Sequence, residues 1–313
     1  MAATTINGAG STLVAPLEGE WATAFQSQTG ISVNYQAVGS GTGITDITGH
    51  LVDFGASDAP LNSSQAQLCS DCVTVPWAVS ATGIGYNLSG IHRVRLTGPV
   101  LAGIYLGQIT KWNDSRITRL NKGEHFPNLT ITPVFRTDGS GDTYAFTNYL
   151  SHVSKTWSSK YGKGTSVTFP APHGAGGKGN SGVTALMEST PGSIAYIAVS
   201  YLFARGLPAA SLQNRAGNWE KPNLTAIQNA ANSVHSVPAN GVSIVDPPKS
   251  ARIAYPISTF TYAIVHRNVS SDVKKFIKFA ISPAGQQFAP GLDFAALPKA
   301  VVNAAKNALN SIH

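Results

Sequence analysis

A group of polar and small residues beginning at Arg136 has the chemistry of an anion-binding site. The preceding run, residues 131–135, is apolar and rich in β-branched side chains, which predicts a buried strand that ends at Arg136. Ser140 is a good N-cap for a following helix, so Gly141 and Asp142 would lie in its first turn, where backbone N–H groups lack intrahelical partners. Free amides, a positive helix end and a guanidinium favour a bound anion. An ordinary strand–turn–helix corner with a surface arginine is the alternative.

Three strands near the start of the chain are also expected to end in small polar residues. They are predicted at residues 5–7, 31–38 and 52–57, and the segments that follow them are residues 8–12, 39–43 and 58–60. In open α/β sheets, loops at the carboxyl ends of strands converge on one crevice. The sequence therefore predicts that these loops lie close together.

Helical periodicity predicts the elements that hold these loops. One face of a helix ending near residue 29 is formed by apolar residues at helical spacing, namely Val14, Leu17, Trp21 and Phe25. Ser11 or Thr12 would be its N-cap. A second such face follows Ser140 and consists of Phe146, Leu150, Val153 and Trp157.

The rest of the chain reads as two α/β lobes. Two long β-rich runs, residues 73–87 and 255–265, bracket the middle of the chain and are interpreted as crossing segments. Residues 193–201 are expected to form a buried strand, and residues 206–250 a helix with surface loops. A chain of 313 residues is long enough for two domains, and the first lobe would then be built from both termini.

Composition narrows the class of protein. The chain is 42% hydrophobic but only 12% charged, with many Ser, Thr, Asn and Gly residues, which suits an exported globular protein. The net charge of +7 is scattered, and no basic tract is interleaved with aromatics, so nucleic-acid binding is not expected. No stretch reaches the roughly 18 apolar residues that span a membrane. Residues 1–3 are interpreted as an initiator placed on a mature sequence whose signal peptide has been removed.

The two cysteines, Cys69 and Cys72, occur as Cys-Ser-Asp-Cys. A redox motif or half of a zinc site is conceivable, but the chain has no other cysteine and no histidine cluster near this motif in the sequence. A short-loop disulfide is the favoured interpretation for an exported protein.

A series of short motifs extends along nearly the whole chain, except for roughly residues 206–250. They are Gly-Ala-Gly-Ser-Thr-Leu (8–13), Gly-Ser-Gly (39–41), Asp-Phe-Gly-Ala-Ser-Asp-Ala-Pro (53–60), Ile-Tyr-Leu-Gly-Gln-Ile (104–109), Trp-Asn-Asp (112–114), Arg-Thr-Asp-Gly-Ser-Gly (136–141), Gly-Lys-Gly-Asn (177–180), Gly-Ser-Ile-Ala-Tyr (192–196) and Tyr-Pro-Ile (255–257). Each motif alone is weak, but their order and combination are highly specific. In these motifs the chain resembles the phosphate-binding proteins of bacterial phosphate ABC importers.

This resemblance implies an α/β fold of the two-lobed type II periplasmic-binding-protein ("Venus flytrap") class, each lobe a mixed sheet flanked by helices. Lobe I would comprise residues 1–84 and 257–313, and lobe II residues 85–256, with hinge segments near residues 77–88 and 252–262. Such a protein closes on one dehydrated phosphate and hands it to the membrane permease of an ABC transporter. We therefore expect an exported monomer, periplasmic or at the cell surface, with inorganic phosphate as ligand and no cofactor.

The resemblance also implies a set of ligand-binding residues. Lobe I would contribute the Thr12 hydroxyl, the Leu13 backbone amide, Ser40 and Asp58, and lobe II Arg136, Asp138, Ser140 and Gly141, with Asp138 orienting the arginine. Two positions depart from the family. Leu13 stands where many relatives have phenylalanine, and Asp142 stands where relatives often have threonine.

The two aspartates have different expected roles. A carboxylate can only accept hydrogen bonds, so Asp58 would bind the P–OH group of phosphate but repel sulfate, which carries no proton. That repulsion costs several kcal/mol, on the order of 10⁴-fold in affinity. Asp142 is either an acid in a helix first turn or a second proton acceptor, in which case the site would prefer doubly protonated phosphate.

Two other classes of function remain as alternatives. A receptor for another tetrahedral oxyanion, such as arsenate, sulfate or molybdate, would use a similar site. A phosphate-ester hydrolase would need an activated nucleophile or metal ions, and the sequence contains no G-x-S-x-G, no H-E-x-x-H and no P-loop motif. We therefore assign no catalytic residue and no metal ligand from the sequence.

Overall fold

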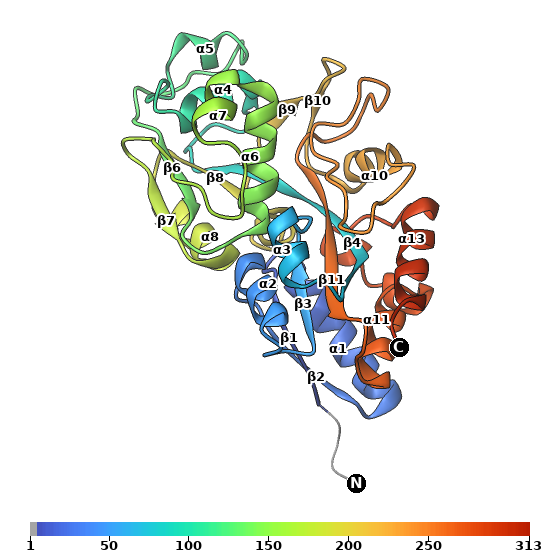
Figure 1. The fold of residues 1–313 in the computed structure, drawn as a ribbon. Coiled ribbons are helices and arrows are strands. Elements are labelled where there is room, and N and C mark those ends of the chain that lie inside the picture. The colour runs from blue at the N-terminus through green and yellow to red at the C-terminus, as the bar shows by residue number, and fades with distance from the viewer. Residues whose placement is uncertain (1–4) are drawn as a thin grey trace.

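The computed structural model describes residues 5–313 as alternating strands and helices (Figure 1). The expected start of the mature sequence at residues 1–3 lies outside the described residues. The strands are β1 (Thr5–Gly10), β2 (Ser32–Gln36), β3 (Phe54–Ser57), β4 (Cys72–Tyr86), β5 (Arg95–Leu96), β6 (Thr132–Arg136), β7 (Ala175–Gly177), β8 (Ser193–Ala198), β9 (Ser211–Gln213), β10 (Trp219–Glu220) and β11 (Ser258–His266). The helices are α1 (Ala15–Thr29), α2 (Ser40–Thr48), α3 (Ser63–Leu68), α4 (Gly98–Tyr105), α5 (Ser115–Thr118), α6 (Gly141–Val153), α7 (Lys155–Lys160), α8 (Gly179–Ser189), α9 (Val199–Ala204), α10 (Leu224–Asn232), α11 (Ser271–Ala280), α12 (Pro283–Gln286), η1 (Pro290–Leu292) and α13 (Lys299–Asn310).

One mixed sheet of eight strands runs through the molecule in the order β2-β1-β3-β11-β4-β8-β6-β7. Parallel pairs lie toward both ends of this sheet, where β1 pairs with β2 and β3, and β6 pairs with β7 and β8. In the middle, β11 is antiparallel to both β3 and β4. The mixed α/β architecture confirms the predicted fold class.

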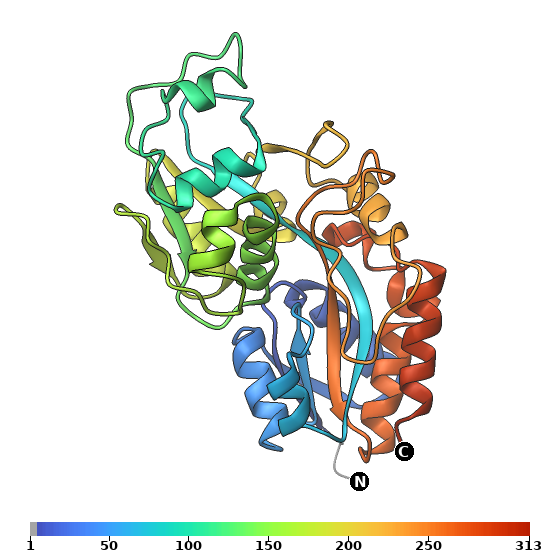
Figure 2. The ribbon, with the colours of Figure 1, turned by 45° about the horizontal axis from the view of Figure 1, so that its top comes forward.

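The strand β4 connects the two ends of the sheet. Residues 72–81 pair with β11, and residues 82–86 pair with β8. Figure 2 shows β4 in cyan beside β11 in orange, between the two helix-covered parts of the molecule. Fourteen of its fifteen residues are buried, which explains why its sequence shows neither strand alternation nor a helical period.

The helix α1 follows the periodicity that the sequence predicts. Leu17, Trp21 and Phe25 are buried on one face, and the Trp21 ring lies 5.1 Å from the ring of Trp77 on β4. Gly30 ends the helix in the left-handed conformation, with φ of 75°. This face joins a hydrophobic core that also contains residues of α11 and α13. A second core surrounds α4, α6 and β8.

Two predicted elements are shorter than expected. The helix predicted to extend from Ser140 through Trp157 is broken at Ser154, which has extended backbone angles and caps the next helix by accepting a hydrogen bond from the Trp157 N–H. The buried strand predicted over residues 193–201 ends at Ala198, where α9 begins. Local capping by serine explains the first difference, because a hydroxyl competes with the helix for backbone N–H groups.

Residues 206–250 contain α10 and the short strands β9 and β10, which form a three-stranded sheet with β5. The prediction of a helix with loops is therefore correct, but it missed this small sheet. Asn223 caps α10 by accepting a hydrogen bond from the Ala226 N–H. Among residues 5–313, no helix has both the length and the apolar character needed to cross a membrane.

Candidate functional site

The end of β6 delivers Arg136 to the interior as predicted. Its side chain is 1% exposed, and its backbone N–H donates to the Tyr196 hydroxyl at 2.9 Å. The turn that follows leads into α6, where the Ser140 hydroxyl accepts a hydrogen bond from the Thr143 N–H at 3.3 Å. Ser140 is thus the N-cap that the sequence predicts.

Two carboxylates neutralise the buried guanidinium. Arg136 Nε donates to Asp138 Oδ1 at 2.7 Å, and Nη2 donates to the other oxygen of the same carboxylate, which gives a two-pronged pair. Arg136 Nη1 lies 3.3 Å from Asp142 Oδ2. Asp138 Oδ1 also accepts a hydrogen bond from the Gly179 N–H at 2.9 Å. Asp138 therefore fixes the direction in which the arginine points.

The Asp58 carboxylate lies at the end of β3 and is only 1% exposed. Its oxygens accept hydrogen bonds from the Ser11 hydroxyl at 2.6 Å and from the Ser40 hydroxyl at 3.3 Å. Burial, and then the negative charge of Asp142, raise the pKa of Asp58 to about 7, against the opposing effects of Ser11, Arg136 and Ser40. Asp58 therefore changes protonation state close to neutral pH.

The loop after β1 is organised by Ser11 and not by an N-cap. The Ser11 hydroxyl accepts hydrogen bonds from the N–H groups of Leu13 and Val14 at 3.0 and 3.3 Å, and it donates to Asp58. The N-cap of α1 is Val14, without a side-chain hydrogen bond, so the prediction of Ser11 or Thr12 as N-cap is wrong. The Ser11 hydroxyl instead holds the turn that precedes α1. The Thr12 side chain is therefore available for another contact.

Thr12 and Asp142 are joined by a residue that the sequence analysis did not select. Asn180 Nδ2 donates to Thr12 Oγ1 at 2.8 Å and to Asp142 Oδ2 at 2.7 Å. The Asn180 Oδ1 accepts a hydrogen bond from the Ala198 N–H at 2.8 Å, which fixes the amide orientation. The motif at residues 177–180 marks this segment in the sequence, but the partners of the Asn180 side chain are visible only in the folded structure.

Asp142 is a buried member of this network and more than an acid in a helix first turn. Its Oδ1 accepts a hydrogen bond from the Thr82 hydroxyl at 2.7 Å, and its Oδ2 contacts Asn180 and Arg136. Burial raises the pKa of Asp142, while Arg136, Thr82 and Asn180 act in the opposite direction. Its contact with Thr82 links the site to β4.

Glycines allow the loops of the two sheet halves to touch. The Gly41 N–H donates to the Gly139 carbonyl at 2.9 Å, which joins the start of α2 to the turn before α6. A Cβ on Gly141 would overlap the Asp58 carboxylate and the Ser40 hydroxyl. Gly39 has φ of 97°, which favours glycine, and a Cβ there would lie 2.5 Å from Asp138 Oδ2. The strand ends that were predicted to share a crevice therefore do meet.

The side chain of Leu13 lies elsewhere. It is fully buried in the core formed with α1, and its N–H donates to Ser11. The leucine that replaces the family's phenylalanine thus acts in packing. The other eight predicted site residues belong to the contacting loops described above.

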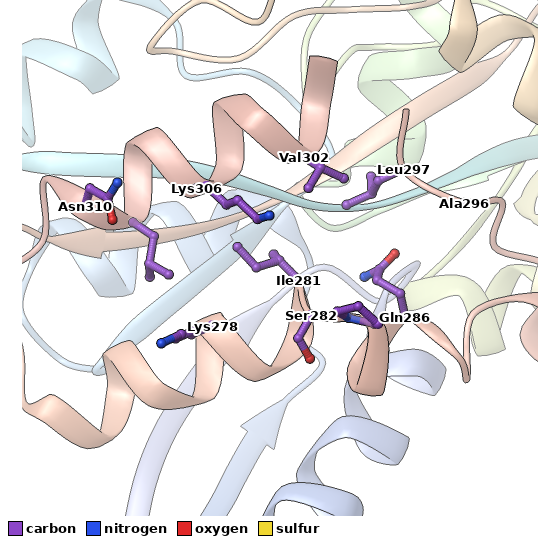
Figure 3. Close-up of a pocket in the computed structure, with 11 residues that line it drawn as sticks. Lys278, Ile281, Ser282, Gln286, Ala296, Leu297, Val302, Lys306 and Asn310 are labelled. Atoms are coloured by element: carbon purple, nitrogen blue, oxygen red, sulfur yellow. The ribbon is translucent and has the colours of Figure 1, made fainter. Parts of the chain in front are cut away.

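A cavity of about 260 Å³ borders this network. It is lined by Thr12, Asp138, Gly179, Asn180 and Tyr201, among others. A larger cavity of about 540 Å³ lies between α11, α12 and α13, where Figure 3 shows apolar side chains with Lys278 and Lys306. Of the predicted site residues, only Thr12 and Asp138 line the smaller cavity, so it lies beside the candidate anion site. The candidate site itself is the point where Asp58, Ser40 and Gly141 meet.

Comparisons with known proteins agree on one family. A family model described as a PBP superfamily domain matches residues 1–284. The chain is 36% identical over 304 residues to the phosphate-binding protein PstS of Xylella fastidiosa, covering 95% of this chain and 82% of that protein. It is 36% identical over 308 residues to the phosphate-binding protein PstS of Pasteurella multocida, covering 96% and 88%. The fold is similar to that of a phosphate-binding protein from Stenotrophomonas maltophilia, with a TM-score of 0.76, 18% identity, and coverage of 97% and 94%.

Proposed function

Because this chain belongs to the PBP superfamily and, within it, to the PstS phosphate-binding proteins, we propose that it binds inorganic phosphate and delivers it to an ABC transporter for uptake. The observation that carries this proposal is the buried Asp58 carboxylate, placed against Gly141 at the N-terminus of α6. There, the ionised Asp58 carboxylate can only accept hydrogen bonds, whereas the surrounding hydroxyls and helix amides can donate them. This combination suits a tetrahedral anion that still carries a proton.

The proposed ligand contacts use residues from both halves of the sheet. Thr12, Ser40 and Ser140 supply hydroxyl donors, and the first amides of α6, beginning at Gly141, supply backbone donors. Arg136 balances the negative charge, while Asp138 and Asp142 hold the guanidinium in place. We assign proton acceptance from the ligand to Asp58, which lies against the first residue of α6. We assign Asp142, which pairs with Arg136 and accepts from Asn180, to the support of those two residues.

We also propose that the chain forms two lobes that close on the ligand. Lobe I comprises residues 1–84 and 257–313 and lobe II residues 85–256, joined near residues 77–88 and 252–262. The change of partner along β4 at Thr82, from β11 to β8, supports this division. The hydrogen bond between Gly41 and Gly139 is then a contact that forms on closure and that opening must break.

The transport role implies a location and a partner. We propose an exported monomer, periplasmic or at the cell surface, that passes phosphate to a membrane permease and needs no cofactor. The low content of charged residues and the disulfide between Cys69 and Cys72 support export. The disulfide was the interpretation favoured from the sequence, and the structure contains it.

Calorimetric titration tests the proposed function. We expect one tight phosphate site per chain, weaker binding of arsenate, and sulfate binding that at alkaline pH is weaker than phosphate binding by on the order of 10⁴-fold. Incubation with a chromogenic phosphate ester should release no product, because we propose a binding protein and not a hydrolase. Equal affinities for sulfate and phosphate, or sustained turnover of the ester, would contradict the proposal.

The raised pKa of Asp58 predicts a pH dependence that sulfate shows more strongly than phosphate. Sulfate brings no proton, so its binding requires protonation of Asp58 wherever that carboxyl is ionised in the free protein. Because the pKa of Asp58 is raised to about 7, sulfate affinity should rise about tenfold per pH unit as the pH falls toward 7, and then level off.

Phosphate brings its own proton, so the ratio of phosphate to sulfate affinity should be greatest at alkaline pH. Titration with both ions from about pH 9 to about pH 5 measures this ratio across the pKa of Asp58. The Asp58→Asn variant is the matched control, because an amide cannot take up the proton. If the sulfate affinity of the unaltered protein does not change with pH, this role for Asp58 is ruled out.

A further inference from the structure

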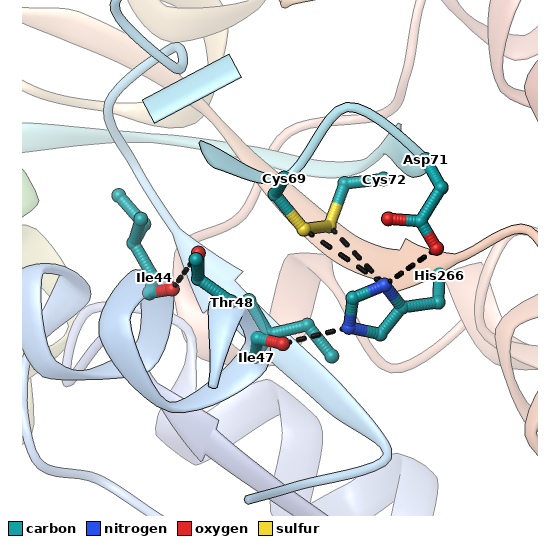
Figure 4. Close-up of a disulfide and its surroundings, with 7 residues drawn as sticks. All are labelled: Ile44, Ile47, Thr48, Cys69, Asp71, Cys72 and His266. Carbon is teal, nitrogen blue, oxygen red and sulfur yellow. Dashed lines mark hydrogen bonds and ion pairs between the residues drawn. A yellow bond between two sulfur atoms is a disulfide. The ribbon is translucent and has the colours of Figure 1, made fainter. Parts of the chain in front are cut away.

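The disulfide lies within a cluster that the sequence does not reveal. Cys69 is the C-cap of α3, and Cys72 is the first residue of β4. The antiparallel pairing of β4 with β11 places His266 directly opposite Cys72. Asp71 lies in the turn between the two cysteines. Figure 4 shows the two sulfur atoms, the Asp71 carboxylate and the His266 ring converging on one point. The histidine that appeared to be missing near the cysteines is supplied by a strand about 200 residues later.

The distances within this cluster match those between the ligands of a tetrahedral metal ion. His266 Nδ1 lies 3.9 Å from each sulfur and 2.9 Å from Asp71 Oδ2, and the four donor atoms all lie within 4.8 Å of one another. Zinc bonds of about 2.0–2.3 Å in a tetrahedron separate neighbouring ligand atoms by about 3.3–3.8 Å. To reach that arrangement, the two bonded sulfur atoms must separate, and Nδ1 and Asp71 Oδ2 must move slightly apart.

The histidine is already oriented as metal-binding histidines are. His266 Nε2 lies 2.7 Å from the Ile47 carbonyl, which can only accept, so Nε2 carries the hydrogen and Nδ1 faces the sulfur atoms. The ring is also stacked on His50, with 3.9 Å between centroids and 11° between planes. The hydrogen bond to Ile47 and the backbone pairing of β11 with β4 fix the imidazole before any ion arrives.

We propose that reduction of the Cys69–Cys72 disulfide by a dithiol turns this cluster into a zinc site with two thiolates, His266 and Asp71 as ligands. The dithiol is oxidised to its own disulfide, and its two electrons and two protons convert the Cys69–Cys72 bond into two thiols. Zinc then displaces the two thiol protons, and it is bound by the two thiolates and by lone pairs of His266 Nδ1 and Asp71 Oδ2. Two sulfurs, one nitrogen and one oxygen form a donor set that favours zinc over magnesium or calcium.

The surroundings allow both reactants to reach the cluster. Cys69 and Cys72 line a cavity of about 410 Å³, together with Arg267 and residues of α13. The Asp71 side chain is 54% exposed. A dithiol can therefore approach the sulfur atoms, and an ion has an entry path. This site uses none of the anion-binding residues and does not rest on the proposed function.

The test compares zinc uptake by the oxidised protein and by protein reduced with a phosphine and freed of reductant under anaerobic conditions. Competition with a chromophoric chelator should give one zinc ion per reduced chain, bound at least about 100-fold more tightly than by the oxidised chain. Cobalt in place of zinc should give the thiolate charge-transfer absorption and the visible bands of a tetrahedral site. Circular dichroism monitors folding in both states.

Variants separate this site from nonspecific uptake. Asp71→Asn, at an exposed position, should weaken zinc binding about 10–100-fold, and Cys72→Ser should abolish it. His50→Asn removes the stacked imidazole that is not a ligand and should leave uptake intact, since asparagine tolerates the φ of 55° at that position. Equal uptake by oxidised and reduced protein, unchanged binding by Asp71→Asn, or a reduced chain that unfolds and is not restored by zinc would each overturn the proposal.

Discussion

Replacing Asp58 with asparagine is expected to reduce the ratio of phosphate to sulfate affinity at alkaline pH, where Asp58 is ionised, from on the order of 10⁴ to about 10. The native carboxylate is buried against the N-terminus of α6 and accepts hydrogen bonds from Ser11 and Ser40. An ionised carboxylate can only accept, so it faces a sulfate oxygen with no hydrogen between them. An amide of nearly the same shape can donate, which removes that repulsion.

Both affinities should contribute to this fall in discrimination. Sulfate should bind more tightly to Asp58→Asn, and phosphate more weakly, because a charge-assisted hydrogen bond is replaced by a neutral one. Calorimetric titration with both ions gives the two affinities. Asp53→Asn is a matched control on an exposed carboxylate five residues earlier, and it should leave both affinities unchanged. Retained discrimination in Asp58→Asn would remove the physical basis of the proposed selectivity.

Replacing Arg136 with alanine is expected to lower phosphate affinity by at least about 1000-fold and the free energy of unfolding by about 3–5 kcal/mol. The guanidinium is the buried cation that faces Asp138 and Asp142. Without it, two carboxylates remain in the interior with no opposing charge, and the incoming anion meets their repulsion. Titration and denaturant unfolding measure the two effects separately.

Arg205→Ala is the control for the loss of an arginine. Arg205 pairs with Glu188 at 2.8 Å, but its side chain is 58% exposed, so its removal should change neither the stability nor the ligand affinity measurably. A stable Arg136→Ala protein that still binds phosphate tightly would show that Arg136 is not needed for charge balance. A protein that is stable but does not bind would show that Asp138 and Asp142 tolerate burial without it.

The sequence was most informative where a local rule determines the structure. The buried face of α1 follows from the spacing of Leu17, Trp21 and Phe25, and the position of Arg136 follows from an apolar run that ends in a capped helix. The convergence of strand-end loops follows from the geometry of α/β sheets. These rules, with the resemblance of the motifs, placed the nine expected site residues in loops that contact one another, with Leu13 expected to contribute only its backbone amide.

The remaining features depend on contacts between distant parts of the chain. Asn180 bridges Thr12 and Asp142 only because α8 and α6 begin after the neighbouring parallel strands β7 and β6, and no local pattern encodes that distance. Thr82 lies within an apolar strand, where a threonine is expected to pack and not to bind a carboxylate. His266 reaches the cysteines only through the pairing of β4 with β11. Sequence separation hides such partners because periodicity describes neighbours along a single element.

The place of β11 in the sheet also has a consequence for how the chain is made. This strand lies between β3 and β4, although it is the last of the eleven strands to emerge during synthesis. The N-terminal strands therefore have no central partner until about residue 266 has been translated, and long-range pairing of this kind slows folding. A nascent polypeptide built in this order stays unfolded for longer, which suits the export across a membrane that we propose for this chain.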